Sequence, residues 1–198
     1  TSTELDIGGS RLAISQTTEY PNKGRIEVSL DPQKPASFKL HLRIPTWAGE
    51  QFVPGKLYRY LNPSSETWKL SVNGESVSSK TELGFATIDR EWKKGDKVLL
   101  ELPMPLRLNR CDERVEENHH RLAFTRGPFV LCAEAIDNDG ATQRFYLDPK
   151  PTIDKASLSK VSLPAGSFLK ATTQSNALTE SGKSEKRSLS LVPYYAWN

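Results

Sequence analysis

The side chains of this sequence that could do acid–base chemistry gather in one polar stretch. Glu113, Glu116 and Glu117 lie close together, and Glu134 follows an apolar run. Glycoside hydrolysis by carboxylates needs two such groups about 5–10 Å apart across a sugar site. The three clustered glutamates lack apolar periodicity around them, so we expect a solvated acidic loop. For Glu134 we expect a salt bridge with a neighbouring arginine, and we assign no catalytic residue.

Metal-ligating residue types are few and poorly spaced. His119 and His120 are adjacent, so on a strand their side chains would point to opposite faces. Cys111 precedes His119 by a spacing that matches no standard zinc motif. His41 lies on the polar face of an expected strand and is interpreted as a surface group. The sequence therefore predicts no metal site and no cofactor in this chain.

Nucleophilic and phosphate-binding motifs are missing from the sequence. It contains no Gly-x-Ser-x-Gly elbow and no glycine-rich phosphate loop. A serine or cysteine triad is therefore unsupported.

Aromatic side chains give the best case for ligand binding. Trp47, Tyr58 and Tyr60 lie in a region from 46 to 66 that also contains several glycines and prolines. Sugars place their C–H faces on aromatic rings while polar groups hold their edges. Polar side chains stand nearby: Arg59, Asn62 and Glu66. We predict a carbohydrate-binding site at these three rings, with the alternative that they close the edge of a sandwich or press against another domain.

The elements that must position these residues are strands. Phe38, Leu40, Leu42 and Ile44 alternate with Lys39, His41 and Arg43 over residues 38–44. A period of two is typical of a strand with one buried and one wet face. The same pattern recurs along the chain, and no long segment has helical periodicity.

A pass along the sequence predicts ten to fourteen strands in one or two antiparallel sandwiches. Asn73-Gly74 is a strong hairpin signal, and Gly95 is expected in the left-handed conformation of a turn. We expect Trp68 and Trp92 in the core or at a sheet edge, residues 46–66 as a long loop, and 172–186 as a flexible polar loop. Further strands are expected at these places: 10–20, 26–30, 68–72, 85–88, 98–102, two within 121–134, 145–147, 161–163, 167–171 and 188–192.

Bulk composition excludes several classes of protein. The 198 residues are 36% hydrophobic, enough for a core, and the net charge is only +3. A nucleic-acid binder usually carries a basic stripe, which this sequence lacks. No apolar run approaches the roughly 20 residues that span a membrane. Cys111 and Cys132 could pair or stay free, and a thiol at Cys132 would be buried in an apolar strand.

Several short strings stand in a recognisable order along the chain. They are Thr18–Pro21, Leu42–Ala48, Val72–Gly74, Ile88–Asp96, Leu102–Pro105, Arg126–Glu134 and Pro193–Trp197. In this order they resemble the C-terminal β region of glycoside hydrolase family 127, the β-L-arabinofuranosidase-like enzymes. The resemblance covers nearly the whole chain, and residues 51–60 are similar to an insertion in longer family members.

The resemblance implies a division of labour within a longer protein. Family members carry a helical (α/α)6 barrel with a cysteine nucleophile, a zinc site of cysteines and a glutamate, and a second glutamate as acid/base. Their Glu-x-Cys and Cys-Cys motifs do not occur in this sequence, so no catalytic residue carries over. A zinc ion is therefore expected in the barrel and none in this chain. The chain begins at Thr1 without a methionine or signal peptide, so we expect a piece of something longer.

These observations fix our expectations. The fold is an antiparallel, jelly-roll-like β-sandwich, with one unit over 1–108 and a second over 109–198. The function is to brace the catalytic barrel of a plant-glycan-degrading enzyme, shape one rim of its sugar cleft and mediate a homodimer, with Tyr194, Tyr195 and Trp197 as contact surfaces. The alternative is an autonomous carbohydrate-binding module. Expected partners are the barrel, an oligosaccharide and a second copy, and neither nucleic acid nor a membrane; a periplasmic or extracytoplasmic location stays open.

Overall fold

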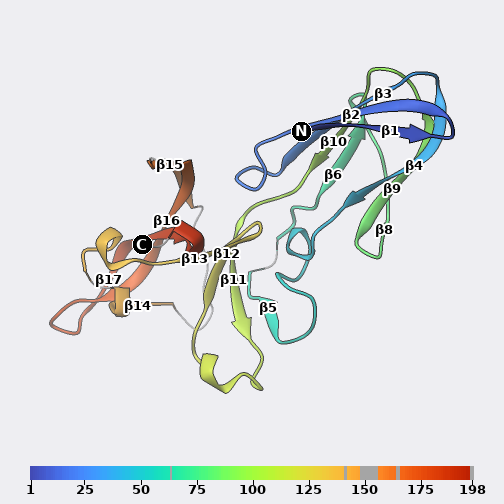
Figure 1. The fold of residues 1–198 in the computed structure, drawn as a ribbon. Coiled ribbons are helices and arrows are strands. Elements are labelled where there is room, and N and C mark those ends of the chain that lie inside the picture. The colour runs from blue at the N-terminus through green and yellow to red at the C-terminus, as the bar shows by residue number, and fades with distance from the viewer. Residues whose placement is uncertain (63, 141, 148–155, 164–165, 197–198) are drawn as a thin grey trace. The chain divides into compact units, whose positions relative to one another are not determined.

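The protein is all β. The computed structural model describes residues 1–198 except 63, 141, 148–155, 164–165 and 197–198. Among the described residues there are antiparallel strands and short 3-10 turns, and no α-helix. The chain forms two compact units, which are described separately (Figure 1). Unit 1 comprises Thr1–Gly49 and Ser65–Met104, and unit 2 comprises Glu50–Ser64 and Pro105–Asn198.

Unit 1 contains two antiparallel sheets. One has six strands in the order β1-β2-β3-β10-β6-β7, and the other has three in the order β4-β9-β8. The strands are β1 (Ser2–Ile7), β2 (Ser10–Thr18), β3 (Arg25–Pro32), β4 (Ala36–Arg43), β6 (Lys69–Val72), β7 (Glu75–Ser76), β8 (Thr81–Glu82), β9 (Phe85–Trp92) and β10 (Asp96–Glu101), with the 3-10 turn η1 (Thr46–Ala48).

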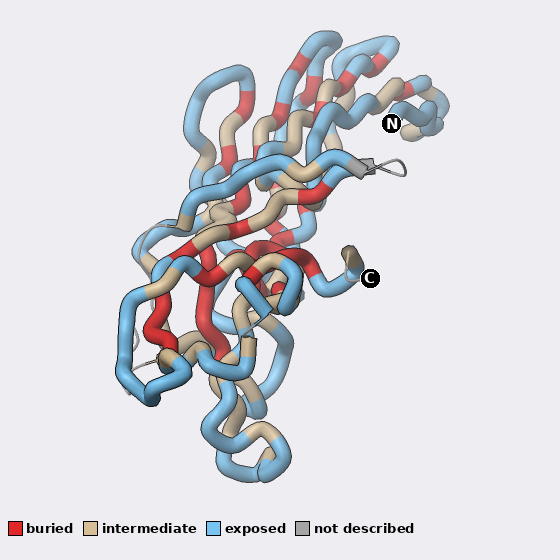
Figure 2. The backbone as a smooth tube through the Cα atoms, turned by 90° about the vertical axis from the view of Figure 1, so that its left-hand side faces the viewer, coloured by how far each residue is buried: buried red, intermediate tan, exposed pale blue. Residues whose placement is uncertain are grey.

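Alternating apolar residues give each of these sheets its buried face. Val28 in β3 lies opposite Val98 in β10, and Val98 in turn lies opposite Val72 in β6. All three are at most 7% exposed, and residues between them on each strand are more accessible. Burying a side chain of this size stabilises the fold by about 1.5–3 kcal/mol. Figure 2 shows this alternation of buried and exposed positions along the strands.

The largest fully buried side chain of the described residues is Trp92, at the end of β9. Its indole N–H donates to the backbone oxygen of Phe38 at 3.0 Å, and its ring stacks on that of Phe38 with centroids 5.8 Å apart. Because the polar N–H is satisfied, the whole indole can be buried without an unpaired donor. This confirms the expected placement of Trp92 in the core, while Trp68 is half-buried.

Turn chemistry fixes the register of these strands. Asn73 and Gly74 both have positive φ, 51° and 86°, between β6 and β7. Gly95 has φ 86° before β10. These are the conformations that the hairpin signals predict. Asn73 also donates its side-chain amide to Asp96 at 2.8 Å, and the Lys93 backbone N–H donates to the same carboxylate at 2.8 Å.

Unit 2 is built on one eight-stranded antiparallel sheet. Its order is β14-β16-β17-β13-β12-β11-β5, and β15 pairs with β16 off this path. The strands are β5 (Tyr58–Tyr60), β11 (Leu106–Cys111), β12 (Ala123–Arg126), β13 (Phe129–Cys132), β14 (Phe145–Tyr146), β15 (Ser157–Leu163), β16 (Gly166–Leu178) and β17 (Ser184–Pro193). The 3-10 turns are η2 (Glu116–Asn118), η3 (Ala135–Asp137), η4 (Thr142–Arg144) and η5 (Tyr194–Ala196).

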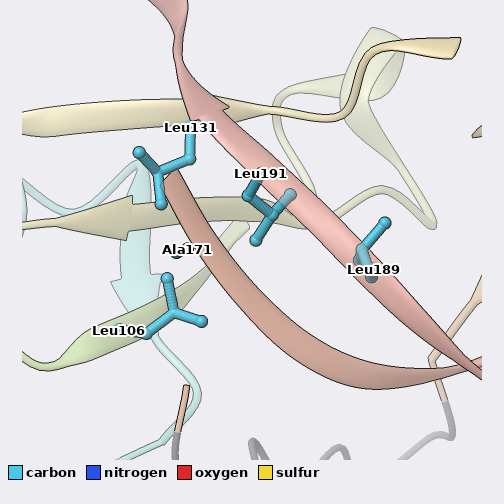
Figure 3. Close-up of a cluster of buried hydrophobic side chains, with 5 residues drawn as sticks. All are labelled: Leu106, Leu131, Ala171, Leu189 and Leu191. Carbon is cyan, nitrogen blue, oxygen red and sulfur yellow. The ribbon is translucent and has the colours of Figure 1, made fainter. Parts of the chain in front are cut away.

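A compact apolar cluster brings distant strands of this sheet together. Leu106 of β11, Leu131 of β13, Ala171 of β16 and Leu189 and Leu191 of β17 form one buried group (Figure 3). Leu106 and Ala171 are separated by three other strands in the sheet order. The sheet must therefore curve strongly for these side chains to meet, as twisted sheets do.

The structure corrects several expectations from the sequence. Residues 172–186 are not a polar loop, because β16 and β17 pair from Ala171↔Leu191 to Leu178↔Ser184 and leave only a short turn. The β1 strand was not expected, and the region from 46 to 66 contains η1 and β5. The expected division into 1–108 and 109–198 remains a prediction, and its boundary lies within β11. Trp197 lies outside the described residues.

The described residues hold no helix long and apolar enough to cross a membrane. Cys111 and Cys132 are both free and only partly buried. Desolvation is the main cause of a raised pKa for the Cys132 thiol, and the nearby Glu134 adds to it.

Candidate functional site

The three rings predicted to bind sugar belong to different units. Trp47 lies in η1 of unit 1, whereas Tyr58 and Tyr60 lie on β5 of unit 2. Trp47 is 9% exposed and stacks on Tyr20, with centroids 6.4 Å apart and an interplanar angle of 17°. A sugar needs an accessible ring face, and most of the Trp47 ring is covered.

Tyr58 and Tyr60 share one face of β5 because they are two residues apart on a strand. Tyr60 pairs with Asn109 and Tyr58 with Cys111 on β11. The Asn118 amide donates to the Tyr58 hydroxyl at 3.5 Å. Their spacing places both rings on one face of β5, and the predicted sugar platform remains a prediction for them.

A buried arginine covers one face of Tyr60. The Arg107 guanidinium carbon lies 3.8 Å from the centre of the Tyr60 ring, and Arg107 is 5% exposed. Burial lowers the pKa of Arg107, and the same cause raises the pKa of Tyr60. The cation–π contact supplies part of the stabilisation that water would otherwise give this cation.

The polar neighbours of the predicted site have separate roles. Asn62 has a structural role: its side-chain oxygen accepts from the Leu108 N–H at 2.7 Å, and its amide donates to the Leu106 oxygen at 3.2 Å. Arg59 lies on the other face of β5 from the tyrosines. Glu66 belongs to unit 1.

A row of buried polar side chains on β11 and β12 was not predicted. Arg107, Asn109, Thr125 and Arg126 are all buried, and the Asn109 amide donates to the Thr125 hydroxyl at 2.8 Å. Burial also lowers the pKa of Arg126. In the sequence these residues occupy positions that a period-two strand would expose to solvent, so that pattern alone does not predict their burial. The one signal for a special strand here was the string Leu-Arg-Leu-Asn-Arg that follows Pro105.

The acidic and histidine residues of the 111–120 segment form a loop around η2. Glu113, Glu116 and Glu117 are exposed, as expected for a solvated acidic loop. One imidazole nitrogen of His119 lies 2.6 Å from the Glu113 backbone oxygen, and the His119 and His120 rings meet edge to face.

Other single residues behave as follows. The Cys111 thiol donates to the Asn118 backbone oxygen at 3.2 Å. His41 is exposed and hydrogen-bonded to the Thr87 hydroxyl at 2.9 Å, in agreement with its interpretation as a surface group.

The expected salt bridge of Glu134 is not formed with any described residue, and one of its buried carboxylate oxygens lacks a hydrogen-bond partner among those residues. Its backbone oxygen instead accepts from the Asn138 amide at 2.7 Å.

No group of three or more His, Cys, Asp or Glu side chains could hold a metal ion among the residues that the structure describes. The donor set of this part of the chain therefore does not fit a zinc site of cysteines and a glutamate.

Comparisons with known proteins cover both units. Residues 1–104 match the family described as "Beta-L-arabinofuranosidase, GH127 middle domain", and residues 106–198 match "Glycoside hydrolase family 127 C-terminal domain". A non-reducing end β-L-arabinofuranosidase of Bifidobacterium longum subsp. longum is 27% identical over 95% of this chain.

Solved structures give the same picture. A GH127 β-arabinofuranosidase superposes with a TM-score of 0.84 at 32% identity, covering 99% of this chain and 31% of its own. A GH127 β-L-arabinofuranosidase from Geobacillus stearothermophilus T6 gives a TM-score of 0.82 at 26% identity, covering 99% and 30%. The chain thus spans about 30% of the length of these relatives. It belongs to glycoside hydrolase family 127, and it corresponds to the middle and C-terminal domains of that family.

Proposed function

We propose that this chain is the non-catalytic β region of a longer family 127 enzyme, and that it braces a helical catalytic barrel. The observation that carries the proposal is the partial match: relatives described as β-L-arabinofuranosidases are about three times as long as the stretch matched here. The length outside the match is enough for a separate domain that carries the chemistry. In this proposal the parent enzyme releases arabinofuranose, and its zinc ion belongs to the barrel.

An apolar groove of unit 2 offers a surface for the barrel. It has a volume of about 490 Å³ and is lined by Cys132, Glu134, Ile136 and Tyr194 among others. Ile136 is 90% exposed and Tyr194 is 58% exposed. Large apolar side chains exposed to this degree favour an interaction surface.

Tyr195 is the next residue of η5 and is also exposed. The residue is 62% exposed, and its ring packs on that of Phe129 with centroids 5.4 Å apart. Such a ring is held in place by the fold yet remains free to contact another domain. It therefore supports the proposed use of the C-terminal tyrosines as contact surfaces, with a second copy of the chain as the alternative occupant.

The alternative function is an autonomous carbohydrate-binding module that uses Trp47, Tyr58 and Tyr60. The burial of Trp47 and the Arg107 guanidinium on Tyr60 reduce the ring area that a sugar could reach. These contacts favour the bracing role. A rim of the sugar cleft could still be shaped by Tyr58 within that role.

One experiment separates these functions. The purified 198-residue chain is given a chromogenic β-L-arabinofuranoside, and in parallel neutral arabinose oligosaccharides are titrated while Trp fluorescence is recorded. We expect neither turnover nor a fluorescence change at millimolar sugar. Turnover by this chain alone would contradict the non-catalytic assignment, and saturable binding would favour the module.

The bracing role has its own test. The helical barrel encoded with this chain is produced separately, and its melting temperature is measured with and without the chain. We expect a rise that Ile136→Asp and Tyr194→Asp abolish. Leu83→Asp is the matched control, since Leu83 is 93% exposed in a turn of unit 1. An unchanged melting temperature of the barrel in the presence of the chain would refute this role.

A further inference from the structure

A second groove of unit 2 is distinct from both surfaces described above. It consists of two adjoining hollows of about 510 and 660 Å³ that share Arg110 and His120. The first is formed by β5 and the segment before it, the end of β11 and the loop that follows β11. The second continues over residues of β12, β14, β16 and β17.

The first hollow places like charges side by side. Arg59 of β5 and Arg110 of β11 are direct partners in the antiparallel pair. Like charges directly opposite one another destabilise a sheet. Lys56 lines the same hollow, and none of these three forms an ion pair with a described residue. These three side chains concentrate positive charge in the hollow, and a bound anion would reduce the repulsion between them.

The acidic side chains of the groove do not neutralise this charge. Asp112 is held by Arg114, whose Nε donates to it at 2.6 Å. That contact is the main cause of the lowered pKa of Asp112, to which Arg59 adds a smaller effect. Glu113 is the other acidic residue of the lining. Across both hollows, five lysine and arginine side chains face two carboxylates.

The second hollow is largely apolar. Leu122, Phe124, Phe145 and the buried Leu189 line it, together with Arg110, His120 and Arg121. Tyr146 is 38% exposed, and its hydroxyl lies 2.5 Å from that of Ser184. Apolar and aromatic walls of this kind accept the C–H faces of sugar rings.

We propose that this groove binds an acidic oligosaccharide, with hexuronate carboxylates paired to Arg59 and Arg110 and sugar rings against Phe124 and Tyr146. Guanidinium groups recognise carboxylates through parallel N–H···O bonds, which fits the two arginines. A free inorganic anion would use only the cationic hollow, so the apolar continuation favours a saccharide. The inference uses the family assignment and does not depend on the bracing role.

Calorimetric titration of the 198-residue chain tests the proposal. The ligands are an oligogalacturonate, the same oligosaccharide with its carboxyl groups reduced to alcohols, and inorganic phosphate. We expect the acidic saccharide to bind at least tenfold more tightly than the other two, and more weakly at high salt. Equal affinity for the acidic and reduced saccharides, or no binding of either, would overturn the proposal.

Variants locate the site. Arg59→Gln with Arg110→Gln should weaken binding of the acidic saccharide at least tenfold. Tyr146→Ala should weaken it about threefold. The matched control is Lys80→Gln with Lys94→Gln, which removes the same charge from exposed positions of unit 1 and should leave affinity unchanged.

Circular dichroism spectra verify that each variant is folded. If the lysine control weakened binding as much as the arginine pair, the effect would come from net charge alone. That result would overturn the assignment of the site to Arg59 and Arg110. Phosphate binding as tight as that of the saccharide, together with an inert Tyr146→Ala, would show an anion site and contradict a saccharide groove.

Discussion

Unit 1 and unit 2 are both antiparallel β structures, but they bury different chemistry. Of the described residues of unit 1, Asp96 is the single polar or charged side chain in the buried class, and apolar residues fill the rest of the core. Among its described residues, unit 2 buries eight such side chains. They are Arg107, Asn109, Thr125, Arg126, Asn138, Thr173, Ser175 and Asn176.

The difference shows how each unit is specified. A core of alternating apolar side chains gains free energy from burial alone and tolerates small shifts. A buried polar group must find its partner, because an unpaired donor or acceptor costs about 1–3 kcal/mol. The interior of unit 2 therefore depends on directional contacts such as the Asn109–Thr125 hydrogen bond, whereas the core of unit 1 is almost entirely apolar.

Removing the central ring of unit 1 should have the largest effect. We expect Trp92→Ala to lower the free energy of unfolding by about 3–5 kcal/mol, because it deletes a fully buried indole and leaves a cavity. Urea denaturation followed by far-UV circular dichroism measures the change. Leu83→Ala, at a position 93% exposed, should change stability by less than about 0.5 kcal/mol. Similar losses for both would contradict an apolar core centred on Trp92.

A charge placed in the polar core of unit 2 should come next. The Asn138 amide donates to the backbone oxygens of Glu134 and Ser190, at 2.7 and 3.0 Å, and its oxygen accepts from the Ser190 N–H. In Asn138→Asp a carboxylate would face two carbonyl oxygens, so we expect a loss of about 2–4 kcal/mol at pH 7.

The pH dependence of this variant has a definite sign. Burial and the facing carbonyls should raise the pKa of the new Asp above its unfolded value. The variant should therefore recover stability as the pH falls through that pKa. Gln143→Ala, at an exposed position of the same unit, is the control. A loss that does not depend on pH would argue against these contacts.

The buried charge of unit 1 should behave in the opposite sense. Burial works against the ionised Asp96, but hydrogen bonds from Asn73 and Lys93, with nearby Arg90, outweigh it and lower its pKa. This stabilisation is fully present above the unfolded pKa and is lost as the pH falls through the folded pKa. We expect Asp96→Asn to cost about 1–3 kcal/mol at pH 7, and the gap to wild type to close in acid.

Denaturation at a series of pH values measures this gap. Asp89→Asn is the matched control, because Asp89 is exposed and pairs with Lys39 at 3.9 Å. Such surface pairs contribute about 0–1 kcal/mol. A gap that widens in acid would refute the role given to Asp96.

The smallest expected effect concerns the ring beneath the buried arginine. Tyr60→Phe and Tyr60→Leu both lose the hydroxyl, but only leucine loses the ring that Arg107 contacts. We expect the leucine variant to be about 0.5–2 kcal/mol less stable than the phenylalanine variant in urea denaturation. Equal stability would mean that the ring does not compensate the buried cation.

Sequence patterns predicted unit 1 better than unit 2. The alternation over 38–44, the Asn73-Gly74 turn and the left-handed Gly95 all appear as expected. Each depends on local geometry, either the period of a strand or the φ of a turn, so the neighbouring residues suffice to reveal it. The family motifs are likewise short contiguous strings of the sequence.

The long polar strands of unit 2 could not be predicted in the same way. Residues 172–176 are polar, yet Thr173, Ser175 and Asn176 are buried on β16, which pairs with β17 and β14. The sequence predicts a loop there, since no apolar residue alternates.

By itself, then, the sequence determined the fold class, the hairpins of unit 1 and the family. Only the tertiary structure decided that β11 is covered on both faces, which turns Arg107 and Asn109 from wet positions into buried ones. It also decided that Arg59 and Arg110 lie opposite each other. The physical reason is that burial and cross-strand pairing depend on segments distant in the chain, and a local pattern contains no information about them.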